Sequence, residues 1–254
     1  MPVSRPSLLA RVQDCAHAAG ADLMGLVLAA DFDSCQPACG RASARLPRCG
    51  SILVLASGGR GFWDRAALTR GSAPLRQWNA ALASSIAEAL RAEGVAGRVL
   101  LPEHGVSLNF ASLGEMAGLG TVSPVLGCLL HPDYGPWLAM RAAVLVEGEP
   151  FGHAMPRPVS AGFQPCLVCE APCVSSCSGG AFPSSAFDGR SCAQHRHAGG
   201  CADRCEARGA CPLGEEHRLT PAQEVAAQRW RLSASRRRYG FGWWSLVPRR
   251  YRVR

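Results

Sequence analysis

The chain has 254 residues, of which 48% are apolar and 18% are charged, and this composition excludes disordered and collagen-like proteins. All 27 basic residues are arginine, because the sequence contains no lysine, so mechanisms that need a lysine Schiff base or a P-loop lysine are excluded as well. Nine of these arginines lie in the last 26 residues, where no acidic residue occurs, so the basic charge belongs to the C-terminal segment.

Helical and strand patterns alternate through the first 150 residues. Apolar residues at helical spacing predict helices at 7–20, 74–93 and 108–117. Short apolar runs predict buried strands at 21–30, 51–56, 99–101, 125–130 and 137–146. This mixed order predicts an α+β layered domain over residues 1–150.

The apolar stretches are too short for a membrane-spanning helix. The longest, Leu23 to Ala30, is far below the roughly 20 residues that a bilayer requires, and the start of the chain lacks the pattern of a secretion signal. We therefore expect a cytoplasmic protein with no transmembrane segment. In a reducing cytosol the 13 cysteines would stay free of disulfides and favour metal ligation or redox chemistry.

A change of pattern follows residue 150, where prolines and glycines mark a linker. From Gln164 onward we find no long periodic segment, which is typical of a region organised by metal clusters. We predict a second domain at 151–228 and a tail rich in arginine and aromatic residues at 229–254. Three interpretations of the tail stay open: a strap packed on the body, an RNA contact, or a membrane-surface contact.

Eight of the cysteines lie between residues 166 and 211 in two groups. The first group is Cys166, Cys169, Cys173 and Cys177, and the second is Cys192, Cys201, Cys205 and Cys211. A [4Fe–4S] cluster needs four thiolates, and a tight loop can supply three while the fourth comes from elsewhere. The eight therefore predict two [4Fe–4S] clusters. Zinc, one cluster with one zinc, and inert thiols are the alternatives.

In two-cluster ferredoxins the fourth cysteine of each run binds the other cluster. Applied to this sequence, the pattern assigns Cys166, Cys169, Cys173 and Cys211 to one cluster. It assigns Cys177, Cys192, Cys201 and Cys205 to the other.

Other cysteines and histidines have simpler interpretations. Cys35, Cys39 and Cys49 are three thiols without a histidine between them, so surface or half-buried thiols are favoured over a third metal site. Cys15 and Cys128 lie in apolar segments that predict core positions. His195 and His197 lie between predicted ligands, where either could replace a cysteine at iron.

Several motifs occur in a characteristic order over roughly residues 100–212. They are Ala117-Gly118-Leu-Gly120, Leu129-Leu-His-Pro-Asp-Tyr-Gly-Pro-Trp137, the first cysteine group, Phe187-Asp-Gly-Arg-Ser-Cys192, and Cys201 to Cys211-Pro212. In this order they resemble the landmarks of epoxyqueuosine reductase and its relatives, which include the reductive dehalogenases. The resemblance implies an N-terminal domain similar to flavin reductases or nitroreductases, followed by a ferredoxin-like domain with two [4Fe–4S] clusters. Cobalamin is the first candidate for a cofactor bound on the N-terminal domain.

The same resemblance supplies further site residues. Gly118, Gly120 and Gly135 would let the backbone approach a flat tetrapyrrole. The alternative, of equal weight, is that these glycines only end a helix or form turns. The acidic residue of the family is replaced at its offset by His104, beside Glu103. These two residues are the weak catalytic candidates, since either could donate a proton.

The chain lacks the C-terminal helical repeats with which the family grips tRNA, so the resemblance implies a short paralogue. We predict an iron–sulfur oxidoreductase that takes electrons from a ferredoxin- or flavodoxin-type donor protein. It would pass them through two [4Fe–4S] clusters to a cofactor or substrate on the N-terminal domain. The alternatives are a non-catalytic electron carrier or adaptor for a partner enzyme, and an RNA-binding module that acts through the tail.

Overall fold

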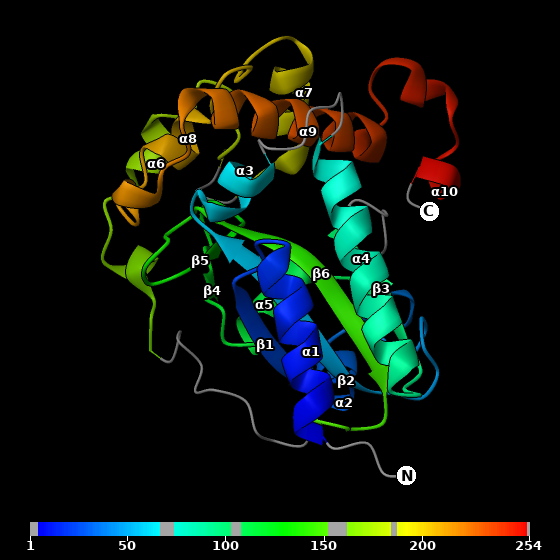
Figure 1. Cartoon of the computed structure of the whole chain (residues 1–254). Helices are drawn as coiled ribbons and strands as arrows, with labels where there is room; N and C mark the ends of the chain where they lie inside the picture. The colour runs from blue at the N-terminus through cyan, green and yellow to red at the C-terminus, as the bar shows by residue number, and fades with distance from the viewer. Residues whose placement is uncertain (1–4, 67–73, 103–107, 152–161, 184–186, 253–254) are drawn as a thin grey trace.

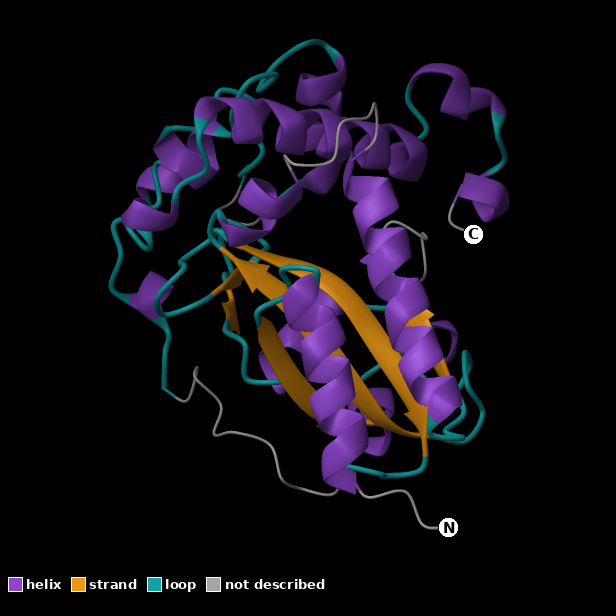
Figure 2. Ribbon diagram, viewed as in Figure 1, coloured by secondary structure: helices purple, strands orange, loops and turns teal. Residues whose placement is uncertain are grey.

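The structure is a computed structural model of the whole chain, and it describes residues 5–66, 74–102, 108–151, 162–183 and 187–252. Its centre is a four-stranded antiparallel sheet (Figures 1 and 2). In spatial order the strands are β1 (Leu23–Leu28), β2 (Cys49–Gly58), β6 (Leu138–Glu147) and β3 (Gly97–Leu100). A separate two-stranded pair is formed by β4 (Thr121–Val122) and β5 (Leu129–Leu130).

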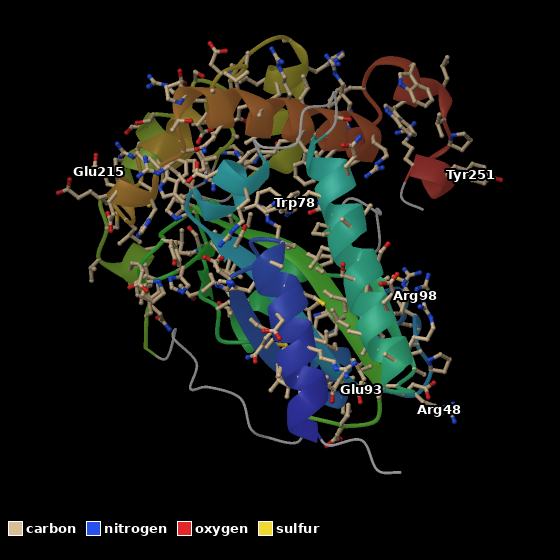
Figure 3. The ribbon with its side chains drawn as sticks, in the orientation of Figure 1. Arg48, Trp78, Glu93, Arg98, Glu215 and Tyr251 are labelled. Atoms are coloured by element: carbon tan, nitrogen blue, oxygen red, sulfur yellow. The ribbon has the colours of Figure 1, made fainter. Side chains whose placement is uncertain are left out.

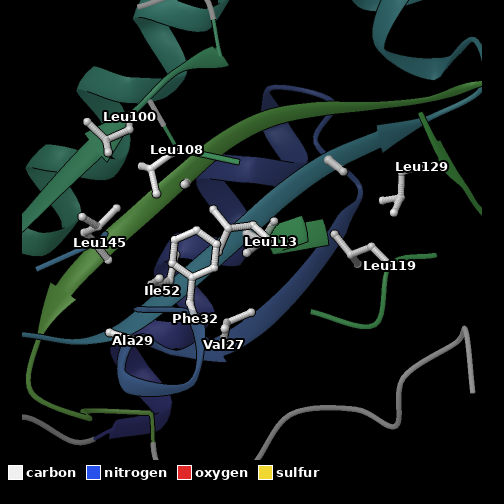
Figure 4. Packing of buried hydrophobic residues seen from close by; sticks show 14 of the residues in the cluster. Val27, Ala29, Phe32, Ile52, Leu100, Leu108, Leu113, Leu119, Leu129 and Leu145 are labelled. Carbon is white, nitrogen blue, oxygen red and sulfur yellow. The ribbon is translucent and has the colours of Figure 1, made fainter. Parts of the chain in front are cut away.

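Helices cover both faces of the sheet. On one face lie α1 (Arg5–Ala18) and α4 (Pro74–Ala92), and their apolar residues pack on Leu53 and Leu55 of β2 and Val144 of β6. The other face carries α2 (Ala29–Ser34) and α5 (Phe110–Met116), and its core is shown in Figure 4. Because alternate side chains of the two central strands enter opposite cores, both strands are apolar almost throughout.

The C-terminal part lies across one end of this sheet (Figure 1). It consists of loops and short helices followed by one long helix, α9. Its helices are η3 (Pro165–Leu167), α6 (Pro172–Ser175), α7 (Gly189–His197), α8 (Glu206–Gly209), η4 (Glu215–His217), α9 (Pro221–Tyr239), η5 (Gly242–Leu246) and α10 (Arg249–Arg252). The N-terminal part also contains two short helices, η1 (Ala38–Gly40) and α3 (Gly61–Ala66).

The expectation that no long regular segment follows Gln164 is wrong, because α9 is 19 residues long. Its apolar residues do not recur at helical spacing, and the residues it buries include the polar Glu224 and Gln228. Its ends, however, are strongly marked. The Thr220 side chain accepts a hydrogen bond from the Gln223 N–H, the Gln223 side chain accepts one from the Thr220 N–H, and Gly240 ends the helix at a φ of +73°.

Two predicted strands are also shorter in the structure. The strand predicted at 21–30 ends at Leu28, because α2 begins there. Of the strand predicted at 125–130, only β5 forms, because a turn held by Ser123 occupies the preceding residues. The Ser123 hydroxyl accepts a hydrogen bond from the Leu126 N–H, and Gly127 adopts a φ of +64°.

An aromatic cluster joins α9 to the N-terminal part. Trp230 of α9 packs with Trp63 and Trp78 around the buried ring of Phe62. Trp78 lies beneath α9, between α3 and α4 (Figure 3). The predicted division of the chain at residues 150 and 228 stays a prediction, although residues 229–239 are the second half of α9. Among the described helices, none combines the length and apolar character needed to cross a bilayer.

Candidate metal centre

The first set of cysteines lines one cavity. Cys166 lies on η3, Cys169 in the loop after it, Cys173 on α6, and Cys211 directly after α8. All four line a cavity of about 80 Å³ that is partly open to solvent. The other lining residues are mostly apolar, and they include Val125, Leu126, Leu130, Pro165, Pro212 and Leu213.

Electrostatics supports the same grouping. Burial raises the pKa of the Cys173 thiol, and the charges of Cys211, Cys166 and Cys169 raise it further. Burial also raises the pKa of Cys211, where the Leu213 N–H opposes the shift and the charges of Cys166 and Cys169 add to it. Such mutual effects require thiols that are close together. The metal-free thiols of Cys173 and Cys211 are therefore protonated at neutral pH, and metal binding would release their protons.

The second set comprises the remaining four cysteines. Burial raises the pKa of Cys192 on α7, and the charges of Cys205 and Cys177 raise it further, while Arg196 lowers it. Burial likewise raises the pKa of Cys201, with Cys205 again among the causes. Cys205 is thus the shared neighbour in this set. Cys177 therefore lies near Cys192 of the second group, and Cys211 lies near Cys166 and Cys169 of the first. The crossed ligand assignment stays a prediction.

The spacing of these thiols bears on the kind of metal group. A tetrahedral zinc site draws its sulfur ligands to about 2.3 Å from one ion. In the part of the chain that the structure describes, no three Cys, His, Asp or Glu side chains are placed to hold a single metal ion. Zinc and iron–sulfur clusters both take cysteine thiolates as ligands, so the chemistry of the two cysteine sets fits either group.

A ninth cysteine, Cys128, lies close to both sets, although its apolar surroundings predict only a core position. Burial raises the pKa of Cys128 to about 11, Arg208 lowers it, and the charges of Cys211, Cys205 and Cys166 raise it. The neighbouring Ser123 places its hydroxyl oxygen 3.3 Å from the sulfur of Cys166. Neither residue could be assigned from spacing, because only the fold brings the β4–β5 connection to the cysteines.

Arg208 is a buried cation of this region, as is Arg196, and the sequence analysis missed both. Arg208 is only 9% exposed, and its Nε donates a 2.9 Å hydrogen bond to the Pro136 carbonyl oxygen. Its guanidinium carbon lies 4.5 Å from the centre of the Trp137 ring. Burial lowers the pKa of Arg208, and the nearby Cys128, Glu224 and Cys205 raise it. Arg208 therefore supplies positive charge beside the second set of thiols.

The predicted cofactor-binding glycines are all in left-handed conformations. Gly118 follows α5 at a φ of +72°. A Cβ on Gly120 would lie 2.2 Å from the Leu130 carbonyl oxygen, and one on Gly135 would lie 2.2 Å from that of Leu213. Close packing of the chain on itself therefore accounts for Gly120 and Gly135. Their contact with a tetrapyrrole stays a prediction.

The other candidates are dispersed or not described. Glu103 and His104 lie outside the described residues. Cys35 and Cys39 are exposed, whereas the Cys49 thiol donates a hydrogen bond to the Ser51 carbonyl oxygen.

The two histidines near the second set have polar partners of their own. His195 Nε2 lies 3.2 Å from the Ser178 hydroxyl oxygen. His197 accepts a hydrogen bond from Arg236 and stacks on Phe241. These contacts give neither histidine a position that favours iron ligation over the eight cysteines.

Comparison with known proteins finds similar folds among solved structures. No protein-family model matches the sequence, and no curated protein matches it. An epoxyqueuosine reductase from Bacillus subtilis aligns with a TM-score of 0.60 and 15% identity, over 87% of this chain and 69% of its own. An epoxyqueuosine reductase with an epoxyqueuosine-modified tRNA-Tyr stem loop gives 0.59 and 15%, with the same coverage. A catabolic reductive dehalogenase with 3-bromo-4-hydroxybenzoic acid gives 0.57 and 17%, over 88% of this chain and 35% of its own.

The chain has the fold of the epoxyqueuosine reductases and reductive dehalogenases. The resemblance that the motifs predict is thereby confirmed at the level of the fold. The antiparallel sheet with helices on both faces is consistent with the predicted α+β class.

Proposed function

We propose that the chain is an iron–sulfur reductase that passes electrons through two [4Fe–4S] clusters to a cofactor or substrate on its N-terminal domain. The observation that carries this proposal is the grouping of the cysteines into two sets of four, in which Cys211 joins the first run and Cys177 the second. When bound, such clusters supply one-electron chemistry. The fold shared with epoxyqueuosine reductases and reductive dehalogenases supports a reductase.

The chain's own residues would hold and shield these groups. Cys166, Cys169, Cys173 and Cys211 would hold one cluster, and Cys177, Cys192, Cys201 and Cys205 the other. Leucine and proline side chains line the cavity around the first set. The positive charge of Arg208 offsets negative thiolate charge beside the second set.

Cobalamin is the first candidate for the electron acceptor, because one structure of similar fold is a reductive dehalogenase with a suggested mechanism of B12-dependent dehalogenation. The described residues do not form a cradle for a corrin ring at Gly120 and Gly135, since backbone carbonyl oxygens fill the space beside them. The three main cavities formed by the described residues have other linings. Corrinoid binding therefore rests on the fold likeness, and we assign no residue to it.

The first experiment is to purify the protein without oxygen and to measure iron, sulfide, zinc and cobalt together with the electron paramagnetic resonance spectrum after reduction. We expect about eight iron and eight sulfide ions per chain. The spectrum should show magnetic coupling between two nearby reduced clusters. The Cys173→Ala and Cys192→Ala variants should each lose about half of the iron. The Cys35→Ala variant is the control, because Cys35 is exposed and outside both sets. Zinc without sulfide would contradict the proposal.

An electron carrier or adaptor is the second candidate. It is favoured by the filled space beside Gly120 and Gly135, which leaves these two glycines a packing role. Affinity for a corrinoid or a flavin separates the two functions. Protein that retains stoichiometric cobalt is a reductase, whereas protein with both clusters and no affinity for either cofactor is a carrier that serves a partner enzyme.

A further inference from the structure

The turn between β4 and β5 lies against the first set of cysteines. Ser123 of this turn is 1% exposed and lines the cysteine cavity together with Cys166. Its hydroxyl oxygen lies 3.3 Å from the Cys166 sulfur, although the two residues are 43 positions apart in the sequence. Apart from the cysteines themselves, Ser123 is the one residue in the described lining of this cavity that has a polar side chain. A buried hydroxyl in apolar surroundings costs free energy unless it is hydrogen-bonded, so its contacts define what it does there.

Three hydrogen bonds hold the Ser123 side chain in one position. The Ser123 N–H donates to the Cys128 carbonyl oxygen at 2.9 Å, and the Gly127 N–H donates to the Ser123 carbonyl oxygen at 3.0 Å. The Leu126 N–H donates to the Ser123 hydroxyl oxygen at 2.9 Å. The turn is thus closed on itself, and the hydroxyl is oriented toward Cys166 before any metal group binds.

The Ser123 hydroxyl is the donor in its contact with a metal-bound Cys166. A serine hydroxyl has one hydrogen to donate and two lone pairs that accept. One lone pair takes the Leu126 N–H, and the hydrogen stays available for an acceptor. A cysteine that binds a metal group is a thiolate, which has no hydrogen to donate. The contact is then an O–H···S hydrogen bond from Ser123 to Cys166.

A hydrogen bond of this kind acts on the reduction potential of a cluster. Potentials of iron–sulfur clusters are set in part by hydrogen bonds to the sulfurs. A cluster gains negative charge when it takes up an electron, so a donor stabilises the reduced state more than the oxidised state. The effect is stronger in apolar surroundings, and the lining of this cavity includes Val125, Leu126 and Pro165.

We propose that Ser123 tunes the cluster of the first set: its hydroxyl donates a hydrogen bond to the Cys166 thiolate and raises the reduction potential of that cluster. Ser123 acts through Cys166 and is therefore a positioning residue. The inference rests on the proposed function and specifies it further, because a raised potential makes the first cluster easier for an electron donor to reduce.

The test is a potentiometric titration of the anaerobically purified full chain, followed by electron paramagnetic resonance of the reduced clusters. We expect Ser123→Ala to lower the potential of one cluster and to leave the other nearly unchanged. At a fixed potential, the ratio of reduced to oxidised first cluster should fall about tenfold, which corresponds to about 59 mV for one electron. Ser175→Ala is the matched control. The Ser175 hydroxyl lies on α6, which also carries Cys173, and donates to the Pro172 carbonyl oxygen.

Two further variants separate the hydroxyl from the packing of the turn. Ser123→Thr and Ser123→Val add nearly the same bulk, and only the first retains a hydroxyl. We expect Ser123→Thr to keep the potential of the unaltered protein and Ser123→Val to shift as Ser123→Ala does. Should Ser123→Ala lose its iron, this pair decides. Equal shifts in the pair, or loss of iron from both, would make Ser123 a packing residue of the turn and overturn the proposal.

The Cys192→Ala variant assigns the shift to one cluster. It should keep the cluster of the first set alone, so adding Ser123→Ala to it should lower the one remaining potential. A shift that disappears in this background belongs to the second cluster and contradicts the proposal.

Iron and sulfide measured on the same samples separate this inference from the proposed function. Protein with both clusters, and with the same potentials in Ser123→Ala as in the unaltered chain, overturns the role of Ser123 alone. Protein with zinc and without sulfide overturns the reductase and the role of Ser123 together.

Discussion

Arg208 donates hydrogen bonds from Nε and Nη2 to the carbonyl oxygen of Pro136, at 2.9 and 2.5 Å. This contact joins the segment between Cys205 and Cys211 to the turn that precedes β6. At the same junction the backbone of Gly135 packs directly against Leu213. The turn at 131–136 and the cysteine segment therefore position one another, and substitutions in the turn should affect the metal centre.

The first prediction concerns Gly135→Ala. Its φ of +52° strains any side chain, and the new Cβ would lie 2.2 Å from the Leu213 carbonyl oxygen. Gly94→Ala is the matched control, because Gly94 has a φ of +65° with open space around it. We expect Gly94→Ala to lower the free energy of unfolding by about 1 kcal/mol. Gly135→Ala should lower it by about 1–3 kcal/mol more and reduce the bound iron. Equal losses in chemical denaturation would contradict the junction described above.

The second prediction concerns Cys128, whose thiol lies close to both sets. If the eight other cysteines are the ligands, Cys128→Ala should keep the same iron and sulfide content as the unaltered protein. The comparison is Cys173→Ala, which should lose about half of its iron. A loss of iron from Cys128→Ala would instead make Cys128 a ligand and displace one of the eight.

The third prediction concerns pH and His131. Its Nδ1 accepts hydrogen bonds from the N–H groups of Asp133 and Tyr134, at 3.0 and 3.3 Å. Burial lowers the pKa of His131 below its usual 6.5, Asp133 and Asp22 raise it, and His217 lowers it. The folded state thus binds fewer protons than the unfolded state. The contribution of His131 to stability is present above pH 6.5 and is lost as the pH falls through the lower pKa of the folded state.

We expect the free energy of unfolding to decrease between pH values of about 7.5 and 5.5, and His131→Asn to make this decrease smaller. Asparagine retains a side-chain acceptor for the two backbone N–H groups but does not titrate. His17→Asn is the control, because His17 is exposed on α1. An identical pH dependence in all three proteins would exclude His131 as the cause.

The fourth prediction tests the RNA contact, which is one of the three roles that the sequence leaves open for the tail. Truncation after Gly240 keeps α9 whole and removes four of the arginines together with Trp243, which is 65% exposed. We expect weaker binding of a single-stranded RNA and a decrease of up to about 3 in the slope of log affinity against log salt. Trp243→Ala should weaken binding without changing that slope. An unchanged affinity after truncation would exclude the RNA contact and leave the strap and the membrane-surface contact.

Features that depend on local pattern are the ones that the sequence predicts best. β2 and β6 are apolar runs because both of their faces are covered. The two-cluster ferredoxin pattern, applied to the cysteine spacing, gives the crossed ligand grouping, which stays a prediction. α9 could not be found from periodicity, because it buries Glu224 and Gln228 as well as apolar residues. Its end signals, the Thr220–Gln223 capping box and Gly240, were nevertheless present in the sequence.

Features that depend on tertiary proximity escaped prediction. Trp137 and Arg208 are 71 residues apart in the numbering, and nothing in either segment indicates that they share a cavity. The proximity of Cys128 to both sets arises in the same way, because the fold returns the β4–β5 connection to the cysteines. Spacing identifies ligands within one run, whereas partners from different elements require the fold.

The packing of Trp230 against Phe62 and Trp78 links the completion of the metal centre to the integrity of the N-terminal core. α9 begins ten residues after Cys211, so its docking depends on how the cysteine segment is held. If the proposed clusters hold the cysteine segment in place, a chain without them would leave these aromatic rings uncovered. Exposed rings of this kind make an unfinished chain prone to aggregation and a target for proteolysis, so cofactor supply would set the abundance of the protein as well as its activity.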